Sequence, residues 1–237
     1  MRVHDRNWMQ IEEYLRHDDR IVLPVGSTEQ HGYLSLGTDA ILAGRVAEEA
    51  AEPLEIPVLP TLPFGMAPYF ADYPGSMSLR ITTYIEVIRD LLDTLAGQGF
   101  RRIAIVNGHG GNAPVTGLIR EWLSAQRNSS VEVLFHSWYN APRTAAAASA
   151  FSDVQLHGAW VENFAWTRVE GAEIPEGSIP PLSRGLTAVL SSAEMRAAAP
   201  DGSHGGDYGR PDADMQQVWD AGVLEVRDLL ENGWSKK

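Results

Sequence analysis

The sequence contains no cysteine, and lysine occurs only as Lys236 and Lys237. The lack of cysteine excludes disulfides, thiolate metal sites and cysteine nucleophiles, so any metal must be held by nitrogen and oxygen ligands. The scarcity of lysine argues against catalysis through a Schiff base. A chain without cysteine also suits the reducing cytoplasm, which is where we expect this protein.

Long apolar runs are missing as well. No segment approaches the roughly 20 apolar residues that a transmembrane helix needs, and the first residues have no apolar centre of the signal-peptide type. Basic residues are few, since 19 Lys and Arg stand against 31 Asp and Glu, for a net charge of −12. Because such a charge repels phosphate backbones and anionic lipids, we expect a small-molecule substrate and neither a nucleic-acid nor a membrane partner.

The rest of the composition is typical of one globular domain. The chain has 237 residues, 44% of them hydrophobic, which suits a single domain over residues 1–237. The runs 20–25 and 102–106 are apolar without alternation, as in strands that are covered on both faces. Such runs alternate with segments of helical spacing. We therefore predict an α/β fold: a three-layer sandwich with a mostly parallel central sheet and helices on both faces.

The predicted elements can be placed along the chain. We expect strands at 20–25, 56–59, 102–106 and 131–135, and helices at 8–15, 39–51, 82–97, 157–169 and 214–230, with one more through Leu118 and Trp122. In parallel sheets, ligands sit beyond the carboxyl ends of the strands. The polar clusters that follow the strands at 20–25 and 102–106 can therefore meet at one edge of the sheet.

The first polar cluster follows the strand at 20–25. Glu29, His31 and Asp39 fall within eleven residues. Carboxylates and imidazoles are suitable ligands for Zn, Mn or Fe, and the Glu-x-His spacing lets two side chains of an extended segment reach the same side. The alternative is a loop with two solvated polar residues and a helix-capping Asp39.

The second cluster, Asn107-Gly-His-Gly-Gly-Asn112, follows the strand at 102–106 directly. Glycines beside His109 permit close approach of the backbone to a ligand, and a helix that begins here offers free amide donors. The alternative is a nucleotide-binding loop, because Gly108, Gly110 and Ala113 fit a relaxed G-x-G-x-x-A spacing. The sequence lacks the acidic residue expected after the next strand and has no GK[ST] motif, which disfavours that alternative.

The third cluster pairs His157 with Glu162. On a regular helix, residues five apart lie about 140° apart around the axis, so the two side chains would not share a face. With His157 just before the helix and Glu162 inside it, both would still reach one cavity. The alternative is a surface histidine and a surface glutamate.

Together these segments resemble the creatininase family of amidohydrolases. The shared pattern is LPVG-x-x-EQHG…GTD, then NGHGGN, then H-x-x-x-x-E. Tyr73-Pro-Gly-Ser76 is similar to the family's F-P-G-T element, and Tyr208-Gly-Arg-Pro211 to its late G-x-P element. The resemblance implies a sandwich that binds two divalent ions (Zn, Mn or Fe) in each subunit and assembles as a homohexamer.

The resemblance also implies roles for the metal-binding residues. Mapped onto matching positions, Glu29 and His109 would bind one ion, His31 and Glu162 would bind the other, and Asp39 would bridge them.

Catalytic and substrate-binding roles follow in the same way. His157 is similar to the family's histidine near the substrate, and we expect His157 and Glu162 to carry proton transfers. Backbone amides would hold an oxyanion, and aromatic side chains near the motifs would line a pocket for a flat ring. The alternative is that most of these aromatic side chains pack in the core or between subunits. The expected substrate-binding residues are Gly110, Gly111, Tyr69, Trp138 and Trp160.

The chain departs from the family pattern in three places. Creatininases carry Tyr-Glu where this chain has Gly110 and Gly111, so the carboxylate for the second ion must come from elsewhere, and Glu162 is our candidate. The spacing from His31 to Asp39 is one residue shorter than usual, and the usual E-T-S is Glu162-Asn163-Phe164 here. These departures argue against creatinine as the substrate.

We therefore predict a dinuclear metal-dependent hydrolase of a C–N bond in a small molecule, of the amide, cyclic amide or lactam type. Three alternatives remain: C–C or ring-opening hydrolysis of a cyclic ketone, trimming of a cofactor-precursor peptide, and a binding protein that has kept a metal site. The other histidines are interpreted as surface or packing residues: His4, His17, His136 and His204.

Overall fold

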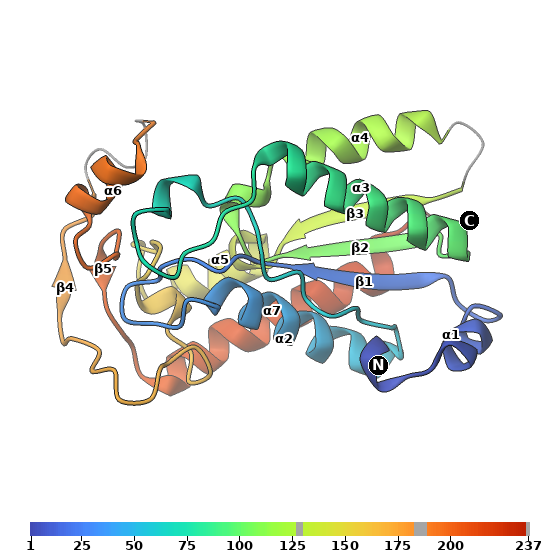
Figure 1. Cartoon of the computed structure of the whole chain (residues 1–237). Coiled ribbons are helices and arrows are strands. Elements are labelled where there is room, and N and C mark those ends of the chain that lie inside the picture. Colours follow the sequence, from blue (N-terminus) through green and yellow to red (C-terminus); the bar gives the residue numbers. More distant parts are fainter. Residues whose placement is uncertain (127–129, 183–188, 236–237) are drawn as a thin grey trace.

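Three parallel strands form the central sheet of the computed structural model, which describes residues 1–126, 130–182 and 189–235 (Figure 1). The strands β1 (Arg20–Val25), β2 (Arg102–Asn107) and β3 (Glu132–Ser137) lie in that order. β1 and β2 are aligned so that Val25, the last residue of β1, lies opposite Asn107, the last residue of β2. The carboxyl ends of these two strands therefore reach the same edge of the sheet.

Helices cover both faces of this sheet, as predicted (Figure 1). One face carries α2 (Thr38–Ala51), α5 (Pro142–Ser149) and α7 (Asp212–Asn232), and the other carries α3 (Ile81–Gln98) and α4 (Val115–Ala125).

Successive side chains of β1 enter the two cores in turn. Val22 packs with residues of α2 and α7, whereas Ile21 and Leu23 pack with residues of α3 and α4. Because side chains of a strand alternate between its faces, two covered faces require an unbroken apolar run, as β1 has.

The remaining elements are short. They are α1 (Trp8–Tyr14), α6 (Ser192–Ala198), the antiparallel pair β4 (Ser178–Ile179) and β5 (Gly206–Asp207), and the 3-10 turns Val3–Asp5, Glu52–Leu54, Pro68–Phe70, Gly110–Asn112, Trp138–Asn140 and Trp160–Glu162. No helix in the described part of the chain is both long and apolar enough to cross a membrane.

The prediction of a strand at 56–59 is wrong, because these residues form no continuous ladder with a neighbouring strand. It is reduced to isolated parallel bridges from Val58 to Val22 and to Arg2. Pro57 and Pro60 flank Val58, and a proline cannot donate the amide hydrogen bonds that a longer ladder needs.

The predicted helix at 157–169 is also wrong, because only Trp160–Glu162 forms a single 3-10 turn. Gly158 has φ +66°, a backbone conformation that favours glycine, and Ala159 is extended. The chain therefore reverses between His157 and Glu162. In this arrangement the Gly158 amide donates to Glu162 Oε2 at 2.7 Å, and both side chains face one cavity.

Candidate metal centre

The loops that leave β1 and β2 carry most of the candidate site. Glu29 and His31 lie in the loop after β1, and Asp39 lies in the first turn of α2, which follows that loop. His109 lies directly after β2. The paired ends of these two strands thus bring residues together that are 80 positions apart in the sequence, from Glu29 to His109.

Glycines allow these two loops to lie against the start of α2. A Cβ on Gly26 would lie 2.5 Å from backbone atoms of Ala40, and a Cβ on Gly108 would lie 2.5 Å from the carbonyl oxygen of Asp39. Real Cβ atoms do not come so close to backbone, so these positions require glycine. The two glycines therefore let both loops approach the backbone at the start of α2, where Asp39 lies.

Five side chains form two groups that share Asp39. The ligand atoms of Glu29, Asp39 and His109 all lie within 4.8 Å of one another, and so do those of His31, Asp39 and Glu162. Asp39 Oδ1 lies 3.0 Å from His31 Nε2, and its Oδ2 lies 2.9 Å from His109 Nδ1. Each group combines carboxylates with an imidazole, which suits Zn or Mn. The structure brings together the two sets that the family resemblance implied.

The two histidines of these groups are oriented by backbone carbonyls. His31 donates from Nδ1 to the carbonyl oxygen of Glu29 at 3.0 Å, which leaves Nε2 facing the carboxylates. His109 donates from Nε2 to the carbonyl oxygen of Met66 at 3.0 Å, which leaves Nδ1 facing them. Metal-binding histidines are usually held in this way, with the second nitrogen donating to a carbonyl or carboxylate.

Two carboxylate oxygens at the centre of the cluster have no hydrogen-bond partner within the described residues. They are Glu29 Oε2 and Asp39 Oδ2, on side chains that are almost completely buried. The neighbouring nitrogen of His109 is close to both oxygens but is not aligned for a hydrogen bond. A buried carboxylate oxygen that accepts no hydrogen bond is costly, and divalent cations would remove that cost. The donor set therefore fits metal ions.

The acidic side chains perturb the protonation of the cluster. Burial alone would lower the pKa of His31, but the carboxylates of Asp39 and Glu162 outweigh it and raise this pKa to about 10. Burial raises the pKa of Glu162 to about 7, against the opposing effect of His31. Burial and the charge of Asp39 raise the pKa of Glu29. Without cations the cluster therefore retains protons that bound cations would displace.

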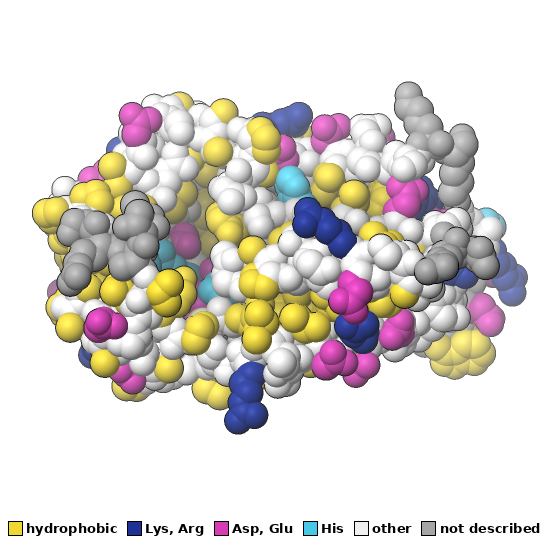
Figure 2. Space-filling model, turned by 90° about the horizontal axis from the view of Figure 1, so that it is seen from above, with side chains coloured by type: hydrophobic (Ala, Val, Ile, Leu, Met, Phe, Trp, Pro, Cys, Tyr) yellow, Lys and Arg dark blue, Asp and Glu magenta, His cyan; other side chains and the backbone are white. Residues whose placement is uncertain are grey.

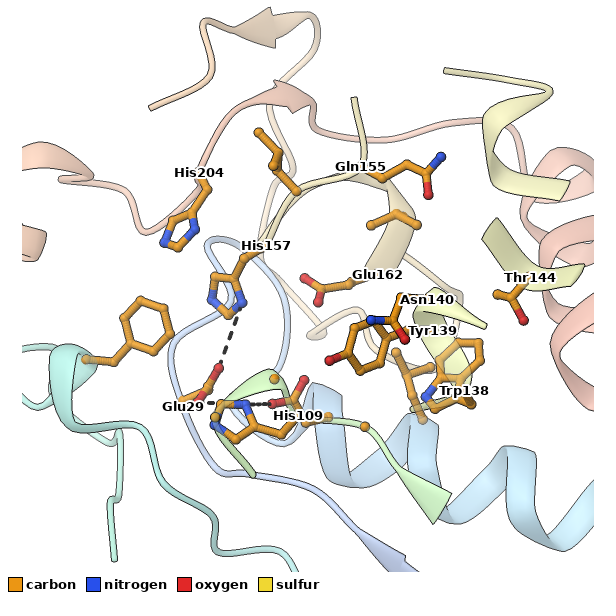
Figure 3. A pocket seen from close by; sticks show the side chains of 18 of the residues that line it. Glu29, His109, Trp138, Tyr139, Asn140, Thr144, Gln155, His157, Glu162 and His204 are labelled. Atoms are coloured by element: carbon orange, nitrogen blue, oxygen red, sulfur yellow. Dashed lines mark ion pairs between the residues drawn. The ribbon is translucent and has the colours of Figure 1, made fainter. Parts of the chain in front are cut away.

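His157 lies next to this cluster (Figure 3). Its Nε2 donates to the carbonyl oxygen of Gln30 at 2.7 Å, and its Nδ1 lies 3.8 Å from Glu29 Oε1. Its ring is 4.3 Å from that of His31 and stacks on Phe70 at 4.7 Å, measured between ring centroids. Burial and the neighbouring His31 lower the pKa of His157 well below its usual value. His157 also forms a third possible ligand group with Glu29 and His31.

A cavity of about 300 Å³ borders the cluster, a volume that suits a small molecule. In Figure 2, histidine and acidic side chains are visible inside a hollow between hydrophobic ones. Four of the predicted substrate-binding residues line the cavity: Gly110, Gly111, Tyr69 and Trp138. The predicted helix at Gly110 is a 3-10 turn, and α4 begins after Pro114.

The structure does not place the fifth predicted substrate-binding residue, Trp160, in the cavity wall. It is completely buried in the core under α2 and α7 and does not line the cavity. Its indole Nε1 donates to the carbonyl oxygen of Val154 at 2.8 Å, and the guanidinium of Arg210 lies over its ring. The reversal of the chain at Gly158 turns this side chain inward.

Sequence analysis missed one histidine of the cavity. His204 was interpreted as a surface or packing residue, yet it lines the cavity beside His157. His4 and His17 are exposed, and His136 is partly buried away from the cavity, which agrees with the interpretation. No local pattern distinguishes His204, because its neighbours Ser203 and Gly205 are ordinary loop residues.

Comparison with known proteins identifies the family. The model of the creatininase family, described as creatinine amidohydrolase, matches residues 4–230. This chain belongs to the creatininase family. Two solved structures show the same fold: a creatininase described as the Mn form, 20% identical with a TM-score of 0.81 over 99% of both chains, and a putative creatinine amidohydrolase from Bacteroides fragilis, 23% identical with a TM-score of 0.75 over 98% of this chain and 95% of that one.

Three curated relatives differ from one another in activity. The chain is 29% identical to the 3-dehydro-scyllo-inosose hydrolase of Thermotoga maritima over 134 residues, 56% of this chain and 43% of that protein. It is 31% identical to the creatinine amidohydrolase of Pseudomonas putida over 114 residues, 45% and 44% of the two chains. It is 36% identical to the mycofactocin precursor peptide peptidase of Mycolicibacterium smegmatis over 99 residues, 39% and 40%. The matches thus span less than half of each relative.

Gly111 is the position at which the family resemblance led us to expect a glutamate. A Cβ at this position would lie 2.1 Å from the carbonyl oxygen of Met66 and 2.4 Å from His109 Nε2. The fold therefore has no room for a glutamate at residue 111. Glu162, whose Oε1 lies 3.8 Å from His31 Nε2, is the carboxylate that completes the group of His31 and Asp39.

Proposed function

We propose that this protein is a dinuclear metal-dependent hydrolase that cleaves a C–N bond of a small amide, cyclic amide or lactam. The observation that carries the proposal is the pair of ligand groups that share Asp39 at the wall of the cavity. A shared carboxylate is the natural bridge between two cations. Membership of the creatininase family and two solved creatininases described as Zn–Zn and Mn forms support the same conclusion.

Bound divalent cations, of Zn, Mn or Fe, would polarise the scissile carbonyl and make water a nucleophile near neutral pH. The residues of the chain would hold them in the two groups described above. Glu29 and His109 would bind one, His31 and Glu162 the other, and Asp39 both.

His157 and Glu162 would move the protons of the reaction. Both face the cavity, and Glu162 is fixed by the amide of Gly158. Nε2 of His157 keeps its proton in the bond to the carbonyl of Gln30, so Nδ1, which points toward Glu29, would accept a proton from the attacking water and pass it to the leaving nitrogen. The backbone at Gly110 and Gly111 lines the same cavity and would face the developing oxyanion.

The substrate is proposed to be a small ring other than creatinine. Gly111 removes the carboxylate that creatininases carry there, while Tyr69 and Trp138 offer flat walls. Two other substrates follow from particular relatives: ring opening of a cyclic ketone, favoured by the inosose hydrolase, and trimming of a cofactor-precursor peptide, favoured by the mycofactocin peptidase. Product analysis separates them, because ketone ring opening releases no amine.

We further propose a cytoplasmic homo-oligomer, a hexamer by the family resemblance. Large apolar side chains are exposed on the loop before α3 and at its start, namely Phe64, Met77 and Ile81. Light scattering coupled to size-exclusion chromatography tests this, and a monomer would contradict it.

The first test of the function is metal content. Protein purified without chelator is analysed by elemental mass spectrometry beside the variants Glu29→Ala and His109→Ala, and then assayed on a panel of cyclic amides. About two ions per chain, reduced in both variants, is the expected result. Metal content that is absent, or indifferent to both substitutions, would overturn the proposal in favour of a binding protein.

A further inference from the structure

A second imidazole lies in the cavity wall beyond His157. The ring of His204 lies 4.8 Å from that of His157 and 5.7 Å from that of Phe70, and Figure 3 shows it next to His157. His204 borders the cavity but belongs to neither ligand group that shares Asp39. The mechanism proposed above does not use it.

The backbone holds His204 in a fixed position. Its amide donates to the carbonyl oxygen of His157 at 2.9 Å, and its own carbonyl oxygen accepts from the amide of Leu182 at 2.9 Å. The adjoining Gly205 has φ +122°, and a Cβ there would lie 2.4 Å from the backbone of Pro181. The segment that carries His204 is thus tied both to the catalytic histidine and to a neighbouring loop.

The side chain, in contrast, lacks a partner. His204 Nε2 is buried and has no hydrogen-bond partner within the described residues. Trp138 Nε1 and Thr144 Oγ1 are also buried without a hydrogen-bond partner within the described residues, and both residues line the same cavity. These three atoms are covered by the protein and do not themselves meet the cavity. The other ring nitrogen of His204, Nδ1, also makes no hydrogen bond within the described residues but is not covered, so it can meet a polar ligand in the cavity that His204 borders.

The imidazole would bind this ligand without a charge. Burial and the proximity of His31 lower the pKa of His204 to about 4. A neutral imidazole has one donor and one acceptor nitrogen, so it can bond to a carbonyl, an amide N–H or a hydroxyl.

We propose that His204 is a substrate-binding residue whose Nδ1 hydrogen-bonds a neutral polar group of the substrate at the end of the cavity next to His157. The inference rests on the proposed function, because the bound molecule is taken to be the one hydrolysed at the metal centre. It assigns to the substrate a second polar group besides the scissile amide.

The test compares His204→Phe with a matched control. Phenylalanine keeps a ring against Phe70 and His157 but removes both nitrogens. His136→Phe is the control, because His136 Nε2 is also buried and unpartnered but lies outside the cavity. KM, kcat, metal content and Tm are measured for each, with hydantoin (a cyclic ureide) and 2-pyrrolidinone (a lactam) as probes.

The expected result is a KM for hydantoin that is about 3- to 10-fold higher in His204→Phe, the effect of one lost hydrogen bond. Metal content and Tm should match those of the control, and His204→Gln should restore part of the affinity. 2-Pyrrolidinone, which has no second polar group, should be affected less. An unchanged KM for hydantoin, or a lower metal content, would overturn the inference.

Failure of the proposed function is distinguishable, because it shows in the wild-type protein as a lack of metal or of turnover of both probes. The Tm comparison does not depend on any substrate. If His204→Phe lowers the Tm by more than His136→Phe does, the imidazole serves the fold and the inference is wrong. If the Tm of His204→Phe is equal to or higher than that of His136→Phe, the His204 imidazole does not stabilise the fold, which supports its role in binding a ligand.

Discussion

The carboxylates at the two ends of the central sheet have different cationic partners. At the amino end, Asp18 binds Arg20 at 2.5 Å and Arg102 at 2.9 Å, and Asp19 pairs with Arg102. At the carboxyl end, the carboxylates of Glu29, Asp39 and Glu162 form ion pairs with histidines, and within the described residues no lysine or arginine joins them.

This difference separates a structural charge cluster from a functional one. The amino-end cluster contains its own permanent cations and is complete as folded. The carboxyl-end cluster has only histidines as cationic partners and contains two buried oxygens without a hydrogen bond, so under the proposed function bound cations would supply the rest of its counter-charge. The predictions below test this contrast at each end.

The largest expected effect is that of Asp39→Asn. Because Asp39 belongs to both ligand groups, this change should remove most of the bound metal and lower activity by at least about 100-fold. Asp18→Asn is the control at the other end of the sheet and should keep its metal. Elemental analysis of both variants decides, and equal metal contents would refute the contrast.

Gly111→Glu should be the next most damaging change. It would restore the residue that creatininases resembling this chain carry, but the Met66 carbonyl and His109 occupy the space of its Cβ. We expect a loss of about 2–4 kcal/mol in the free energy of unfolding, and no gain in metal. Gly117→Glu, at a helical position with open space around its Cβ, is the matched control. A stable Gly111→Glu variant with creatininase activity would show that the backbone can move aside.

The pH dependence of stability should differ between metal-free and metal-loaded protein. The carboxylates raise the pKa of folded His31 to about 10, above its ordinary value of 6.5. Between these two pH values the folded state therefore binds more protons than the unfolded state does. Its contribution is complete below pH 6.5 and is lost as the pH rises toward 10. The Tm of chelator-treated protein should therefore fall between about pH 7 and 9. Protein loaded with Mn should not show this fall, because its ligands are already deprotonated.

Asp18→Asn should have the smallest effect, a loss of about 1–2 kcal/mol in the free energy of unfolding. Burial opposes ionisation of this carboxyl, but hydrogen bonds from Arg20 outweigh it and lower its pKa. Its contribution is therefore present above about pH 4 and is lost as the pH falls below that. Thermal unfolding at pH 7 and pH 3 checks this, and a difference between variant and wild type that persists at pH 3 would contradict it.

Much of the fold could be predicted from the sequence, because two cores impose recognisable patterns. The runs in β1 and β2 indicated covered parallel strands, and the spacing in α3 indicated an amphipathic helix. The errors lie where a few backbone angles decide. Gly158 and Ala159 break the expected helix at 157–169, and prolines interrupt the expected strand at 56–59.

The candidate site could be predicted as a set of residues but not as a shape. Strand order alone placed Glu29 and His109 at one edge, since both follow buried parallel strands. Trp160 was misjudged because the positive φ of Gly158 reverses the chain, and His204 because its position depends on contacts far along the chain, with His157 and Leu182. Such contacts leave no local periodicity in the sequence.

Under the proposed function, the separate origin of Glu162 predicts an order in which the two metal ions are held. Glu29, Asp39 and His109 are at most about 5% exposed and lie in the loops that follow β1 and β2 and on α2, so their group is held by the core of the fold. The second group is closed by Glu162, whose side chain is 21% exposed and stands on a single 3-10 turn. The first ion should therefore be retained through dialysis, while the second exchanges with its surroundings.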